Sequence, residues 1–169
     1  MTRRRYTPCP PLLRDEQGRP LCRWCKKPVA PPRRSWCSAE CIHEYRIRSD
    51  GSYIRAQLFE RDQGVCAACG QDTEALRKEL QALRGAIFAA REAPARLEAC
   101  MRAKERFAEV GRMGFKVGGT SPVGGIPCHE TLWHADHVIP VHQGGGECGL
   151  EGLQTLCVPC HDRKTRGGR

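Results

Sequence analysis

Eight of the twelve cysteines in this chain fall into four close pairs, and this spacing limits the possible folds more than any other feature. The pairs make two groups of four: Cys22, Cys25, Cys37 and Cys41, then Cys66, Cys69, Cys157 and Cys160. Two short pairs of thiolates can complete a tetrahedron, the geometry of structural zinc. We therefore expect two structural Zn²⁺ sites. A redox-active Cys-x-x-Cys pair, the alternative for the first group, requires a thioredoxin-like setting that is absent here.

Zinc is favoured over disulfides by the expected compartment of the chain. The first residues, MTRRRYTPCPPLLRDEQ, contain no apolar stretch suited to a signal peptide, and no apolar run reaches membrane-spanning length. We expect an intracellular protein with no membrane partner, in the cytoplasm and nucleoid of a prokaryote or the nucleus of a eukaryote. Of the other cysteines, Cys100 is expected on the apolar face of a helix and Cys148 in turn packing, whereas Cys9 and Cys128 have no predicted role.

Composition indicates that metal rather than a large apolar core stabilises the fold. The chain has 18 glycines and 12 prolines but few aromatic residues. Joining Cys69 to Cys157 closes a loop of 87 residues, which costs about 4 to 5 kcal/mol because loop entropy grows only logarithmically. Structural zinc contributes roughly 10 to 16 kcal/mol in small peptides, so a zinc site offsets the cost of closing this loop.

The chain carries a net charge of +9, from 28 basic and 19 acidic residues. A polyanion is the natural partner of such a chain. The charge favours a nucleic acid as that partner, and a merely soluble basic protein is the alternative. The sequence does not indicate an oligomeric state.

The order of motifs predicts a small α+β fold in six segments. Residues 1–20 form a basic, Pro-rich tail, 21–50 a four-Cys finger with a helix capped by Ser38, and 51–70 a helix capped by Ser52 and the first knuckle of the second zinc site. Residues 71–110 form an inserted helical hairpin, 111–131 a Gly-rich loop, and 132–169 two strands and a helix. The hairpin is predicted from apolar residues at helical spacing: Leu76, Leu80, Leu83 and Ile87, then Leu97, Cys100, Ala103, Phe107 and Val110.

The stretches WHADHVIPVHQGGG and LEGLQTLCVPCHDRKT carry the motif that identifies a chemistry. They resemble the HNH (ββα-metal) endonuclease family, whose pattern is Asp-His-x-x-Pro, a Gly-Gly turn and Asn-Leu-Gln-x-Leu-Cys-x-x-Cys-His. From about residue 22 onward, the chain also resembles the HNH domains of annealing helicases with Ran-binding zinc fingers. No helicase motor accompanies the motif here, so we expect either a stand-alone nuclease or part of a larger protein.

The resemblance implies that the partner is DNA, either double-stranded or branched, and that it is cleaved by a one-metal mechanism. Asp136 and His161 would hold one exchangeable Mg²⁺ or Mn²⁺ ion, and His137 would act as the general base, because an imidazole accepts a proton near neutral pH. The expected products are 5′-phosphate and 3′-hydroxyl ends. After His161, basic side chains are predicted to contact the nucleic acid: Arg163, Lys164 and Arg166. His134 shares a strand face with Asp136 by period-two alternation, so it is a candidate for a further metal or phosphate contact.

One position departs from the family pattern. Gly152 stands where the family has an asparagine that braces the loop between the two strands and positions the general base. Gln154 or an ordered water is a candidate substitute for that brace. A catalytically weak or inactive zinc-dependent nucleic-acid-binding module therefore remains an alternative function. An interaction scaffold is a third, but it would leave Asp136, His137 and His161 without a role.

Overall fold

The structure is a computed structural model that describes residues 9–115 and 131–167. It forms two compact units, Met1–Gln57 with His137–Leu153, and Leu58–Asp136 with Gln154–Arg169. The first part of the predicted tail and most of the predicted Gly-rich loop, including Cys128, lie outside the described residues. No helix in the described part of the chain is long and apolar enough to cross a bilayer.

Two helices follow the finger in the first unit. Helix α1 (Ala39–Ser49) begins after Ser38, whose hydroxyl accepts the backbone N–H of Cys41 at 3.2 Å, so the predicted N-cap is confirmed. Helix α2 (Gly51–Asp62) begins one residue before Ser52, and the predicted cap there is wrong. The Asp50 carboxylate instead accepts the N–H groups of Ser52 and Tyr53, at 3.0 and 3.1 Å. A carboxylate can satisfy two unpaired amides of a helix start at once.

The segment 137–153 of the first unit contains two short 3₁₀ helices. These are η1 (Val141–Gln143) and η2 (Leu150–Gly152). The Arg48 side chain on α1 donates to the backbone carbonyl of Glu147 at 3.0 Å. Its guanidinium also lies 4.9 Å from the centre of the Trp24 ring. One arginine thus joins the finger, α1 and the segment that follows His137.

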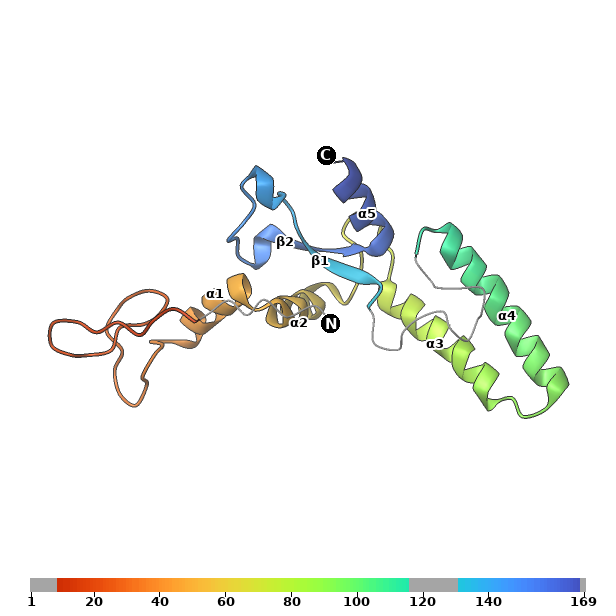
Figure 1. The fold of residues 1–169 in the computed structure, drawn as a ribbon, viewed down its shortest axis with the longest axis horizontal. Coiled ribbons are helices and arrows are strands. Elements are labelled where there is room, and N and C mark those ends of the chain that lie inside the picture. The colour runs from red at the N-terminus through yellow and green to blue at the C-terminus, as the bar shows by residue number, and fades with distance from the viewer. Residues whose placement is uncertain (1–8, 116–130, 168–169) are drawn as a thin grey trace. The chain divides into compact units, whose positions relative to one another are not determined.

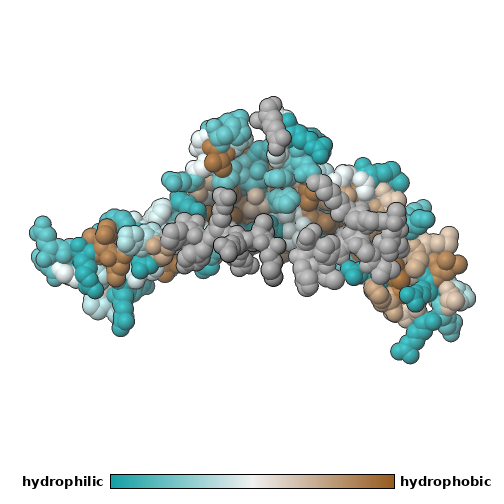
Figure 2. Space-filling model, in the orientation of Figure 1, coloured by the Kyte–Doolittle hydropathy of each residue, from teal (hydrophilic) through white to brown (hydrophobic). Residues whose placement is uncertain are grey.

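A hairpin of two long helices occupies the chain between the halves of the second Cys group (Figure 1). Helix α3 (Thr73–Ala89) begins after Asp72, whose carboxylate accepts two amides of the first turn, and helix α4 is Ala93–Arg112. The predicted apolar face is confirmed for most positions, but Leu97 is 63% exposed and Ala99 is buried in its place. Figure 2 shows apolar surface over this hairpin, where Phe88, Leu97 and Met101 are exposed.

Two strands and a helix complete the second unit. Strands β1 (Trp133–His137) and β2 (Leu153–Cys157) form a two-stranded sheet, and α5 (Val158–Gly167) follows β2 directly. Residues from this region share one buried cluster with α3 and α4: Leu132, Leu156, Cys157 and Cys160. The expected α+β class is confirmed, and the packing holds the start of α5 against the sheet.

Candidate active site and metal centres

The first Cys group is assembled by the finger loop and the first turn of α1. The Cys37 sulfur lies 3.4 Å from those of Cys25 and Cys41, and the four ligand atoms of the group all lie within 4.8 Å of one another. Burial would raise the pKa of Cys22, but N–H groups of Cys37, Cys25 and Trp24 turned toward its sulfur lower that pKa to about 6. This favours a thiolate, the form that binds zinc. The group could hold Zn²⁺.

The second Cys group is built from segments far apart in the sequence. Cys66 and Cys69 lie in a tight turn closed by Gly70, whose φ of 72° and N–H bond to the Cys66 carbonyl suit a residue without a Cβ. Cys157 ends β2 and Cys160 lies in the first turn of α5. All four ligand atoms again lie within 4.8 Å.

The sulfur geometry of this second group matches tetrahedral zinc. The Cys69 and Cys157 sulfurs are 3.8 Å apart, close to the edge of about 3.8 Å that Zn–S bonds of about 2.3 Å would give. Burial opposes ionisation of Cys66, but backbone N–H groups, of Cys157 foremost, lower its pKa to about 7. This group also could hold Zn²⁺, and it would tie the hairpin insertion to the ββα segment.

Asp136 is the centre of a polar cluster on the second unit. Its Oδ2 accepts a hydrogen bond from Gln154 Nε2 on β2 at 3.1 Å and from Lys164 Nζ on α5 at 2.5 Å. Its Oδ1 lies 3.9 Å from Nε2 of His161. Side chains from two elements, β2 and α5, therefore point at one carboxylate on β1. The sequence placed Asp136 and His161 together, but it did not indicate the contacts of Gln154 and Lys164.

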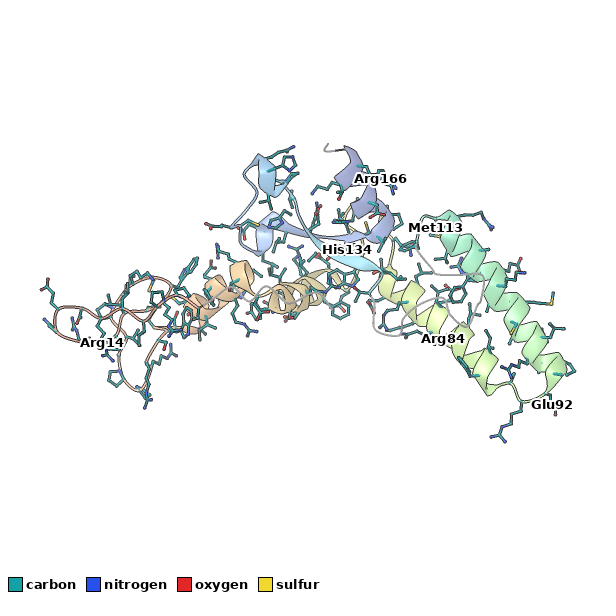
Figure 3. All side chains as sticks on the ribbon, viewed as in Figure 1. Arg14, Arg84, Glu92, Met113, His134 and Arg166 are labelled. Carbon is teal, nitrogen blue, oxygen red and sulfur yellow. The ribbon has the colours of Figure 1, made fainter. Side chains whose placement is uncertain are left out.

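The ring of His161 lies beside this carboxylate, and the ring of His134 lies against that of His161. The rings of His134 and His161 are 4.5 Å apart between centroids and tilted by 40°; Figure 3 labels His134 on β1 and Arg166 on α5. Nδ1 of His161 is buried without a hydrogen-bond partner among the described residues and lies 3.9 Å from Asp162 Oδ1. Nε2 of His161 and the Asp136 carboxylate, 3.9 Å apart, are a nitrogen and an oxygen donor that suit a divalent ion. These residues fit the expected ion.

His137 is the last residue of β1 and belongs to the first unit, directly after Asp136 in the chain. The next residue, Val138, donates its N–H to the carbonyl of Gly152 at 2.8 Å. Cys148 fills the space into which a side chain at position 152 would project. At the position where the family pattern has asparagine, the Gly152 carbonyl thus accepts a backbone hydrogen bond, and Cys148 takes up the side-chain space.

The predicted nucleic-acid contacts on α5 differ in their surroundings. Arg163 and Arg166 are exposed, whereas the Lys164 side chain is only 29% exposed and pairs with Asp136.

Thr155 of β2 was not predicted to have a role from the sequence. It is fully buried and donates to Asp62 Oδ2 at 2.7 Å. The two residues are 93 positions apart, so no local sequence signal joins Thr155 to Asp62.

Comparison with known proteins matches the same region. A family model for HNH endonuclease matches residues 125–167. The "DNA annealing helicase and endonuclease ZRANB3" of Mus musculus is 35% identical over 165 residues, and the human protein of that name is 33% identical. These matches cover 89% of this chain but only 14% and 13% of the two relatives, so the chain spans about one seventh of their length.

One solved structure is also similar. The crystal structure of the human ZRANB3 HNH domain is 26% identical, with 70% of this chain and 88% of that chain covered and a TM-score of 0.40. The family match lies on the segment that carries Asp136, His137 and His161. The chain therefore carries a domain of the HNH endonuclease family over residues 125–167.

Proposed function

We propose that this chain is a divalent-metal-dependent endonuclease that hydrolyses phosphodiester bonds in double-stranded or branched DNA. The observation that supports it most is the pairing of Asp136 and His161, 3.9 Å apart, in the segment that matches the HNH family. Asp136 and His161 would hold Mg²⁺ or Mn²⁺, which supplies Lewis acidity toward the phosphate and the departing 3′-oxygen. The second Cys group supports this pairing because Cys160 immediately precedes His161.

The proton transfer is assigned to His137. It takes a proton from the attacking water as the water oxygen bonds to phosphorus. The bond from phosphorus to the 3′-oxygen breaks, and this oxygen gains a proton from solvent water. The products carry a 5′-phosphate and a 3′-hydroxyl. Basic side chains that follow His161 on α5 are proposed to hold phosphates: Arg163, Lys164 and Arg166.

Cleavage of supercoiled plasmid and of a branched duplex in Mg²⁺ or Mn²⁺ tests the proposal. His137→Ala should lower the cleavage rate by roughly 10² to 10⁴, the usual contribution of a general base. His142→Ala is the matched control, because His142 is exposed on η1 and has no assigned role. Equal cleavage by His137→Ala and wild type, or no cleavage by wild type, would leave a zinc-dependent DNA-binding module as the function.

A further inference from the structure

The finger carries a pocket that the proposed nuclease mechanism does not use. It has a volume of about 370 Å³ and is lined by Arg33, Arg34, Ser35, Trp36, Ala39 and Ile42. These residues lie in the loop before α1 and in its first turn, within one unit of the chain (Figure 1). Pockets that bind small ligands have volumes of about 300 to 1,000 Å³, so this one is large enough for a nucleotide.

The charge around the pocket is strongly positive. Residues 19–39 include six basic side chains and no acidic one: Arg19, Arg23, Lys26, Lys27, Arg33 and Arg34. Arg33 donates to the backbone carbonyl of Cys37 at 2.5 Å, which orients its guanidinium, and Arg34 is exposed. The first acid after this run is Glu40, whose pKa is lowered first by its hydrogen bond with Ser38. Glu40 and Asp15, which pairs with Arg19 at 2.7 Å, offset only part of this charge, so an anionic ligand is favoured.

The remaining lining of the pocket is aromatic and apolar. Trp36 is half-buried, and its ring lies 5.1 Å from that of Tyr45, tilted by 39°. Ile42 is 39% exposed on the same helix. A tryptophan held against a second ring, beside an exposed apolar side chain, is suited to the face of a nucleobase. The faces of bases inside a duplex are covered by stacking, so the base that fits is an unpaired one.

We propose that this pocket binds one unpaired nucleotide of a DNA strand, with Trp36 stacked on the base and Arg33 and Arg34 holding its phosphates. The choice of DNA rests on the proposed function. Arginine supplies the planar fork that matches phosphate oxygens, and the ring supplies contact that does not depend on base identity. The finger would thus bring the nuclease to DNA that contains a single-stranded segment.

The test measures binding separately from cleavage. The full chain, loaded with zinc and without added Mg²⁺ or Mn²⁺, is titrated against a fluorescent oligothymidine strand and a blunt duplex of equal length. Trp36→Ala should weaken single-strand binding roughly tenfold, as expected for loss of a base stack. The double variant Arg33→Gln/Arg34→Gln should also weaken single-strand binding, because it loses phosphate contacts. Trp36→Phe should retain most of the affinity, because it keeps a stacking ring.

The control removes the same charge elsewhere. Arg91→Gln/Arg96→Gln changes two exposed arginines next to and within α4, and should weaken binding to both DNAs only slightly. Retained zinc in each variant shows that the finger is folded. Wild-type single-strand affinity in both pocket variants, or an equal loss for strand and duplex in Trp36→Ala, would overturn the proposal.

A second measurement distinguishes this proposal from the nuclease proposal. Hydrolysis of bis(p-nitrophenyl) phosphate, which has no base, should be unchanged in the pocket variants. If the wild type hydrolyses neither this compound nor DNA, the nuclease proposal fails, while the affinity ratio between strand and duplex still decides the pocket.

Discussion

The side chain of Cys148 fills the space beside Gly152. A Cβ added at Gly152 would lie 2.4 Å from Cys148 Cβ and 2.7 Å from its sulfur, closer than real carbon contacts come. The two residues are therefore a matched pair, a glycine opposite a small side chain. Because the Gly152 carbonyl also accepts the N–H of Val138, this pair determines the backbone immediately after His137.

Replacing Gly152 with the family's asparagine should therefore lower the stability of this protein and slow its DNA cleavage. We expect Gly152→Asn to lower the free energy of unfolding by about 1 to 3 kcal/mol, the usual cost of overpacking, and to slow DNA cleavage by up to about 100-fold through displacement of the loop. Adding Cys148→Gly should recover part of both losses, and Cys148→Gly alone is the control. Urea unfolding and plasmid cleavage measure the effects. A single Gly152→Asn variant as stable and active as wild type would contradict the pairing.

The ammonium group of Lys164 lies against the Asp136 carboxylate that we assign to the metal. Since an exposed or partly exposed ion pair contributes up to about 1 kcal/mol, Lys164→Met should tighten Mn²⁺ binding by roughly fivefold. Isothermal titration calorimetry on the zinc-loaded protein measures this affinity, and Arg166→Met serves as the control for net charge. Weaker Mn²⁺ binding by Lys164→Met would show that the lysine orients Asp136 for the ion instead of competing with it.

The Asp62 carboxylate should make the free energy of unfolding depend on pH. Its hydrogen bond from Arg61 lowers its pKa below the usual range, burial opposes this shift, and Thr155 adds to it. A lowered folded-state pKa gives stability that is full above the unfolded value of about 3.9 and is lost as pH falls through the folded value. The difference in unfolding free energy between wild type and Asp62→Asn should therefore shrink below about pH 4. Zinc loss in acid would itself unfold the ββα segment, so the comparison uses only pH values at which both proteins retain their zinc.

Removal of zinc should unfold the ββα segment. Cys157→Ser should abolish one bound Zn²⁺ and cause loss of cooperative unfolding in the second unit, because structural zinc contributes roughly 10 to 16 kcal/mol. Cys100→Ser is the matched control: Cys100 packs against the apolar cluster and belongs to neither Cys group. Zinc content by mass spectrometry and thermal unfolding by circular dichroism report the two effects. Full zinc occupancy in Cys157→Ser would contradict the assignment of ligands.

Local spacing made much of this fold predictable. Paired cysteines limit the ligand sets because a short Cys-x-x-Cys turn can span only one edge of a tetrahedron. Ser38 could be assigned as a cap from its neighbours alone. The hairpin's apolar spacing located its buried face, except at Leu97. That residue lies two positions before the buried Ala99, which is about 200° around a helix, so it faces solvent.

The sequence by itself determined which cysteines could bind zinc and which segment matches the HNH family, since both depend on residue type and short spacing. Only the tertiary structure decided what surrounds them. Lys164 and Asp136 are 28 positions apart, and Thr155 and Asp62 are 93 apart. No local pattern encodes such contacts, because they depend on how β1, β2 and α5 pack. The space that Cys148 leaves for position 152 is likewise a property of the folded chain.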